Sequence, residues 1–239
     1  MTKKYLIFFL ALFPMIALFP QQSGFQGKYF LGATGSYLIP IGGLADRMKP
    51  GVGGSFSFGK EVSPDWEWQG KVEYLKLTDV NQDKMIIRNK YTYNNVEREY
   101  DFPMKGIEME LTAYGISANA YWHVLSTELF KANLNIGFGV MRWEYTRSAY
   151  KDSLYYKPTA DTTLFGEYIN VPAFEQSDWS GTFNLGVDLR VKVIEPLWFT
   201  VTANYKNIIG ELWPILKMDM ENVSTFQFAE IRAGFAASF

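Results

Sequence analysis

The stretch Trp179–Val193, with the sequence WSGTFNLGVDLRVKV, decides the fold of this chain. Every second residue, starting at Trp179, is apolar or glycine. The residues between them are mostly polar and include Asp188, Arg190 and Lys192. Successive side chains of a β-strand point to opposite faces. The stretch therefore predicts a long strand with one apolar face and one charged face.

The same alternation recurs along the rest of the chain and predicts a set of eight strands. These are Tyr29–Ile39, Val52–Phe58, Trp66–Tyr74, Ile107–Val124, Phe130–Val140, Trp179–Val193, Phe199–Lys206 and Ala229–Phe239. A soluble β-sandwich also buries one apolar face, so alternation alone leaves that class open. Strand length favours a membrane barrel, because tilted membrane strands need about 9–11 residues and average strands have about 5–6.

The connections between these strands alternate strictly between long and short. The long ones are Pro40–Pro50, Asp79–Pro103, Arg147–Asp178 and Asn207–Ser224, and the short ones are Ser63–Asp65, Leu125–Glu128 and Ile194–Leu197. Barrels of bacterial outer membranes have long external loops and short periplasmic turns. The sequence thus predicts an all-β fold over residues 28–239. This is an eight-stranded antiparallel up-and-down transmembrane β-barrel with long external loops and short periplasmic turns.

The N-terminal segment has the pattern of an export signal. Lys3 and Lys4 precede the uncharged apolar run Tyr5–Phe19, and Pro20–Gly24 ends it. A helix of that run would span about 22 Å, which is short of a hydrocarbon core of roughly 30 Å. We therefore expect a signal peptide over residues 1–24, cleaved between Gln21 and Gly27, rather than a membrane anchor.

Composition narrows the classes of partner and cofactor. The 239-residue chain has no Cys, one His and a formal net charge of −2, while aromatic residues make up 17% of it. Without thiolates and with one imidazole, the sequence predicts no metal site and no cofactor. The charge gives no reason to expect nucleic acid as a partner.

Tryptophan residues gather at the predicted strand ends, beside the turns and loops. Indole rings prefer the headgroup level of a membrane, so they predict two aromatic girdles. The predicted girdle residues are Trp66, Trp68, Trp122, Trp143, Trp179 and Trp198.

The predicted inward faces carry charges of both signs. An eight-stranded barrel is just wide enough for side chains to fill its interior, and buried charges need partners. We expect an ion-pair network that plugs the lumen, with a narrow polar channel as the alternative. Its predicted members are Glu67, Lys71, Glu73, Lys131, Asp188, Arg190, Lys192, Lys206, Glu230 and Arg232.

Two acidic residues, Glu108 and Glu110, share the parity of the lipid-facing Tyr114. A bulge between Glu110 and Tyr114 would turn both carboxylates inward and leave Met109 and Leu111 facing lipid. We favour that bulge over a position above the bilayer.

The chain ends in Phe235-Ala236-Ala237-Ser238-Phe239, an alternating strand with a terminal aromatic residue. In this ending and in its strand and loop pattern, the chain resembles the eight-stranded outer-membrane β-barrels of the OmpA/OmpX type. The resemblance covers about residues 28–239 and implies that Phe235 and Phe239 act as an insertion signal. It also implies a place in the bacterial outer membrane, contact with outer-membrane lipid, and passage through the barrel-assembly machinery.

Three functions are compatible with such a barrel. The first is a non-enzymatic envelope-structural, surface-interaction or envelope-complex role, with a protein partner at the external loops 79–103 and 147–178. Tyr-rich tips suit such capture, and Lys157–Asp161 is the expected tip of a hairpin. The second is a small porin or transporter for small or hydrophobic solutes. The third is a lipid-modifying enzyme, but His123 falls beside a periplasmic turn, where we expect an interfacial role.

The alternation of loops makes a topological prediction. Single Cys residues at Asn95 or Ala160 should react with an impermeant thiol reagent on intact cells, and a Cys at Asp65 should not. Labelling at Asp65 together with silence at Ala160 would reverse the orientation.

Overall fold

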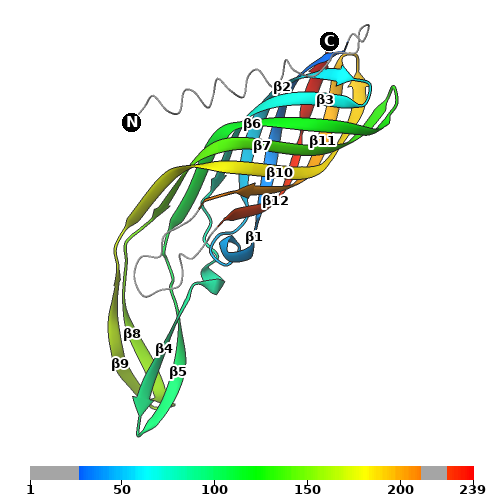
Figure 1. Ribbon diagram of the computed structural model, residues 1–239. Coiled ribbons are helices and arrows are strands. Elements are labelled where there is room, and N and C mark those ends of the chain that lie inside the picture. Colours follow the sequence, from blue (N-terminus) through cyan, green and yellow to red (C-terminus); the bar gives the residue numbers. More distant parts are fainter. Residues whose placement is uncertain (1–26, 211–224) are drawn as a thin grey trace, which may run out of the picture.

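The structure is a computed structural model that describes residues 27–210 and 225–239 (Figure 1). The predicted signal peptide and most of the last long loop lie outside these residues. Eight of the described strands form one closed barrel in the order β1-β12-β11-β10-β7-β6-β3-β2. They are β1 (Tyr29–Ile41), β2 (Gly51–Ser63), β3 (Trp66–Leu77), β6 (Met109–Ser126), β7 (Phe130–Arg147), β10 (Phe174–Ile194), β11 (Leu197–Ile208) and β12 (Phe226–Ser238). No helix among the described residues is long and apolar enough to cross a membrane.

The predicted fold class is confirmed, and each predicted strand corresponds to one strand of the barrel. All neighbouring barrel strands pair antiparallel. The strands β6, β7 and β10 have 18, 18 and 21 residues, against 12 or 13 in the others. The extra length of β7 and β10 continues the barrel wall past its rim on the side of the long loops, and the β6–β7 hairpin also projects at the end with the short turns (Figure 1).

The barrel closes where the first strand meets the last. Tyr29 and Phe239 exchange two backbone hydrogen bonds, from Tyr29 N to Phe239 O at 2.8 Å and from Phe239 N to Tyr29 O at 3.0 Å. Their rings stack with centroids 6.4 Å apart. Phe239 therefore lies beside Tyr29 where the barrel closes.

The outer surface of the barrel is a continuous apolar band. Large apolar side chains from every barrel strand are exposed there, among them Leu31, Phe56, Val72, Ile116, Phe138, Leu185, Val201 and Phe235. A patch of this size would be a liability in water, whereas lipid tails solvate it. The barrel is thus a transmembrane one, with lipid on its outer face.

Two of the predicted girdle residues are placed differently by the structure. Trp143 is 1% exposed and Trp198 is 4% exposed, and both indoles lie inside the barrel. Trp143 donates its Nε1 hydrogen to Ser180 Oγ at 2.8 Å, and Trp198 donates to Ser238 Oγ at 3.1 Å. The prediction failed because it used position along the strand and ignored the strand's parity. Trp66, Trp122 and Trp179 are exposed on the outside, and Trp68 has the same outward parity.

The predicted bulge near Glu110 is also wrong. The register of β6 runs without a shift from Met109 to His123 against β7 and from Leu111 to Trp122 against β3. Met109 and Leu111 therefore point inward and are buried. Glu110 faces outward and pairs with Lys76 at 3.0 Å near the outer rim, where two exposed charges satisfy each other.

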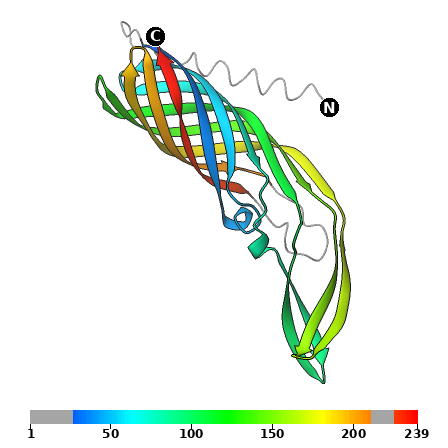
Figure 2. The ribbon, with the colours of Figure 1, turned by 180° about the vertical axis from the view of Figure 1, so that it is seen from behind.

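Two of the long loops contain hairpins that project from the barrel as one arm, most clearly seen in Figure 2. The loop after β3 carries β4 (Ile86–Tyr93) and β5 (Val96–Pro103), and the loop after β7 carries β8 (Tyr150–Thr159) and β9 (Thr162–Val171). The predicted tip within Lys157–Asp161 is confirmed, since β8 and β9 turn at Ala160 and Asp161. Short 3₁₀ helices, η2 (Gly42–Leu44) and η3 (Gln82–Lys84), lie near the rim.

The contact of Phe239 with Tyr29 at the barrel closure predicts that deleting Phe239 affects stability and membrane insertion to different extents. Loss of one ring contact should lower the free energy of unfolding by no more than the roughly 1.5–3 kcal/mol of a buried Phe. Refolding yield in detergent should therefore fall only slightly, whereas outer-membrane levels in cells should fall strongly if Phe239 is an insertion signal. Comparison of the two yields tests this, and equal losses would leave only the ring contact.

Candidate functional site

The lumen is filled by three stacked layers of side chains. The layer nearest the short turns and the middle layer are ionic, and the layer nearest the long loops is apolar. The inward face therefore changes from charged to apolar along the barrel, and the charged layers contain the groups that could bind a ligand or an ion.

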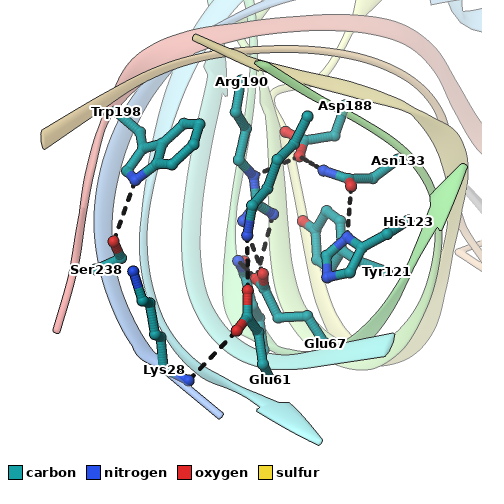
Figure 3. A network of polar contacts seen from close by, with 12 residues as sticks. Lys28, Glu61, Glu67, Tyr121, His123, Asn133, Asp188, Arg190, Trp198 and Ser238 are labelled. Carbon is teal, nitrogen blue, oxygen red and sulfur yellow. Dashed lines mark hydrogen bonds and ion pairs between the residues drawn. The ribbon is translucent and has the colours of Figure 1, made fainter. Parts of the chain in front are cut away.

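The layer nearest the short turns is organised around Arg190 (Figure 3). Its guanidinium forms a fork with Glu67, from Nη1 to Oε2 at 2.8 Å and from Nη2 to Oε1 at 3.2 Å, and Nε donates to Asp188 Oδ1 at 2.7 Å. The guanidinium also lies over the rings of Phe30 and Tyr121, with centroid distances of 5.2 and 5.1 Å. Such a fork fixes position as well as charge.

Asp188 extends this layer to the only histidine of the chain. It accepts hydrogen bonds from Asn133 Nδ2 at 2.8 Å and from Thr202 Oγ1 at 3.0 Å. The other amide atom, Asn133 Oδ1, lies 2.6 Å from His123 Nδ1. His123 is therefore buried inside the barrel, which corrects the expectation of an interfacial residue.

The middle layer is organised around Glu73. Its carboxylate binds Lys206 Nζ at 2.9 Å and also pairs with Arg232. Arg232 reaches Glu230 at 2.8 Å on the same strand. In the same layer, Lys71 contacts the hydroxyl of Tyr121.

Nine of the ten residues predicted for the network are buried in these layers. The tenth, Lys192, is at the open end and pairs with the exposed Glu195 at 3.1 Å. Glu61 belongs to the network as well, since it accepts from Lys131 Nζ at 2.6 Å. Among the described residues, the two ionic layers thus hold five acids (Glu61, Glu67, Glu73, Asp188, Glu230) and five bases (Lys71, Lys131, Arg190, Lys206, Arg232).

The third layer closes the lumen toward the long loops with apolar side chains. It includes Leu38, Leu77, Met109, Leu111, Met141, Trp143, Ile208, Phe226 and Phe228. The rings of Trp143 and Phe226 meet edge to face at 5.1 Å. Residues from the long loops, Leu44, Met48, Met85 and Met104, cover the layer from outside.

Little free space is left between the ionic layers. The cavity beside Lys71, Tyr121 and Arg190 has a volume of about 20 Å³, which is room for about one water molecule. The inward Gly137 leaves room for neighbouring side chains, because a Cβ there would collide with the amides of Asn119 and Asn184.

Outside the membrane, the two hairpins of the arm pack on each other through aromatic rings. Tyr91 of β4 stacks on Tyr156 of β8 with centroids 4.4 Å apart and an interplanar angle of 7°. Phe102 and Leu154 are buried beside them. Polar contacts complete the interface, from Asn89 to Glu167 and from Arg98 Nη1 to Pro158 O at 3.3 Å.

Burial raises the pKa of the phenol groups in the arm. The pKa of Tyr91 rises, and that of Tyr150 rises to about 12 with a further contribution from its hydrogen bond to Asp152. Both hydroxyls therefore stay protonated at neutral pH and donate, Tyr91 to Glu167 at 3.4 Å and Tyr150 to Asp152 at 2.8 Å.

The opposite face of β8 and β9 carries a second aromatic group that no other described part of the arm covers. Tyr155, Phe165 and Tyr168 are 57%, 47% and 77% exposed. Phe165 contacts both tyrosines, with centroid distances of 5.8 Å to Tyr155 and 4.7 Å to Tyr168. We call these three residues the arm patch.

A closed barrel of eight antiparallel strands, with an apolar outer band and a filled polar interior, identifies the fold. It is that of a small outer-membrane β-barrel. No protein-family profile and no curated protein sequence matches the chain.

Solved outer-membrane barrels are similar to this chain in structure. The attachment invasion locus protein Ail of Yersinia pestis is 12% identical over 89% of this chain and 97% of its own, with a TM-score of 0.40. Neisserial surface protein A is 11% identical over 90% and 100%, with a TM-score of 0.43. A major outer membrane protein of Thermus thermophilus is 11% identical over the same shares, with a TM-score of 0.47.

The sequence-based prediction missed two inward residues at the end of the barrel with the short turns, Glu61 and His123. We call this end the barrel floor. Glu61 lies opposite Glu67 in the register of β2 and β3, but the predicted strand ended at Phe58. His123 has inward parity, which its neighbour Trp122 on the lipid face already implied. Following parity to the end of each strand would have found both.

The Arg190 fork predicts that Arg190→Met destabilises the barrel by about 3–5 kcal/mol, because Glu67 and Asp188 would remain buried without their partner. The free energy of unfolding in urea measures this. Lys192→Met is the matched control and should cost at most about 1 kcal/mol, as expected for a pair at the solvent-exposed end.

Single-channel conductance of Arg190→Met should stay far below that of porins. An unchanged stability with porin-like conductance would contradict the plug.

Proposed function

We propose that this barrel is a non-enzymatic outer-membrane protein that binds a protein partner outside the membrane through its arm. The observation that carries the proposal is the packing of two hairpins, distant in sequence, into one arm. Loops without a role in contact have no need to order 36 strand residues (8, 8, 10 and 10) beyond the barrel rim, since ordering each residue costs roughly 1–2 kcal/mol of backbone entropy.

The arm patch is the surface that best fits a protein partner. Its three aromatic side chains do not contribute to the Tyr91–Tyr156 packing that holds the arm together. Aromatic residues are enriched at the centres of protein interfaces. Tyr155, Phe165 and Tyr168 also lie on adjacent strands that each have one unpaired edge, so a partner strand could pair beside them.

The filled lumen argues against the porin alternative. A solute would have to pass the Glu73 and Arg190 layers, where the cavity of about 20 Å³ holds about one water. It would also have to displace the apolar layer around Trp143. Both barriers favour a plug over a pathway.

A lipid-modifying activity is supported less than a binding role. Such chemistry would need its His near the external rim, within reach of lipid headgroups, and His123 lies at the other end of this barrel. Its Nδ1 is held by Asn133 inside the network, where lipid has no access.

Site-specific photocrosslinking on intact cells tests the proposal. A photoreactive phenylalanine at Tyr168 should give one discrete adduct with a protein, and the same residue at Glu97, exposed on the other hairpin, should not. Replacing Tyr155, Phe165 and Tyr168 together by Ser should abolish co-purification of that protein at unchanged outer-membrane levels. No adduct at Tyr168, or equal adducts at both sites, would reject the arm patch as the contact surface.

A further inference from the structure

The barrel floor brings together three groups that all accept hydrogen bonds or bind cations. One ring nitrogen of His123 and one carboxylate oxygen each of Glu61 and Glu67 lie within 4.8 Å of one another. His123 is 7% exposed and Glu67 is fully buried. Figure 3 shows the imidazole turned toward the two carboxylates.

The tautomer of His123 is fixed by its neighbours. Asp188 only accepts hydrogen bonds, so Asn133 must present its NH₂ group to Asp188 and its Oδ1 to the imidazole. Nδ1 of His123 therefore carries a hydrogen. In the neutral ring, Nε2 then presents a lone pair toward the carboxylates.

That lone pair has no partner among the described residues. Glu61 and Glu67 also stand directly opposite each other in the strand register, an arrangement of like charges that destabilises a sheet. Lys131 pairs with Glu61 Oε1, and Arg190 pairs with both oxygens of Glu67. His123 Nε2 is thus the member of the three that lacks a partner. A cation bound among the three groups would give that lone pair a partner and reduce the repulsion between the two carboxylates.

We infer that His123, Glu61 and Glu67 form a binding site for a divalent transition-metal ion of the Zn²⁺ type. One imidazole nitrogen and two carboxylates are a suitable donor set, and three protein ligands leave the fourth position for water. The chain of contacts from Nδ1 through Asn133 to Asp188 is the outer shell that orients a metal-binding imidazole. Ligand atoms around tetrahedral Zn²⁺ lie about 3.4 Å apart, so modest side-chain movement completes the site.

The surroundings allow an ion to enter and its charge to be balanced. Glu61 lines an open vestibule of about 460 Å³ at the end of the barrel with the short turns, together with Lys131, Glu128 and Glu195. When Glu61 turns to the metal, Lys131 can move into this vestibule toward Glu128. Arg190 keeps its contacts with Asp188 and with both oxygens of Glu67. Glu67 Oε1 also accepts from Gln69, so Oε2, which accepts from Arg190 Nη1, keeps a lone pair for the metal.

The test uses the full barrel, purified in detergent without a histidine tag and stripped with EDTA. Zn²⁺ titration should show one site per chain, and Co²⁺ should give the visible absorption of a tetrahedral complex. Because the chain has a single His, one set of imidazole ¹⁵N signals reports directly on His123, and its Nε2 resonance should move on binding Zn²⁺.

Variants separate the site from adventitious binding. His123→Gln and Glu61→Gln should each weaken Zn²⁺ binding by about 100-fold or more, a larger effect than the 10–100-fold typical of outer-shell losses. Glu195→Gln removes a carboxylate of the same vestibule and should change the affinity less than about twofold, because this carboxylate is exposed and pairs with Lys192, so solvent screens its charge.

Two results would overturn the inference. The first is a wild-type barrel whose imidazole signals do not respond to Zn²⁺ but show an imidazolium whose Nε2–H persists above neutral pH, which would make a proton the occupant. The second is equal Zn²⁺ binding by wild type and folded His123→Gln. If His123→Gln fails to fold, the ¹⁵N response of the wild-type barrel decides alone.

Discussion

The constraint on which this structure depends is that hydrocarbon offers no partner to a backbone N–H or C=O group. An open sheet edge in a membrane would leave a row of such groups unsatisfied at several kcal/mol each. The pairing of β1 with β12, from Phe30↔Ser238 to Ile41↔Gln227, removes that edge. Once the sheet is closed, every side chain of a barrel strand points either to lipid or into the narrow lumen. Apolar and polar residues therefore alternate along each strand.

Closure also decides what the lumen must do. Polar side chains that cannot face lipid are confined together, where each charge needs a partner within reach. The described part of the barrel meets this requirement with equal numbers of acids and bases in its ionic layers, and with residues that serve two neighbours, such as Glu73 and Arg190. Among the residues that the structure describes, three acceptors converge only at the floor, around His123. The inferred metal site is thus the one place in the described interior where an imidazole and two carboxylates lie within reach of a single ion.

The sequence predicted the barrel well because its main signal is local. A period of two residues marks strands, and the lengths of connections mark their ends, as Trp179–Val193 and the turn at Ile194–Leu197 illustrate. Parity also placed Arg190 and Glu73 inside. Where position along the strand was used in place of parity, as for Trp143 and Trp198, the prediction was wrong.

Partners across the lumen, such as Glu73 and Lys206, are 133 positions apart, and no local pattern encodes which acid meets which base. The contact of Tyr91 with Tyr156 was equally out of reach, since each loop alone shows only a Tyr-rich hairpin.

The joints between hairpin β8–β9 and the barrel are short. Two residues separate β7 from β8, and two separate β9 from β10. Hairpin β8–β9 has strands of ten residues, which gives a reach of about 33 Å at the usual rise of a strand. A surface held at that distance on short joints, and braced by the second hairpin, has little freedom left to lose when something docks on it. Much of the entropic penalty of association would then already be met during folding, which favours the proposed contact through the three aromatic rings of the arm patch.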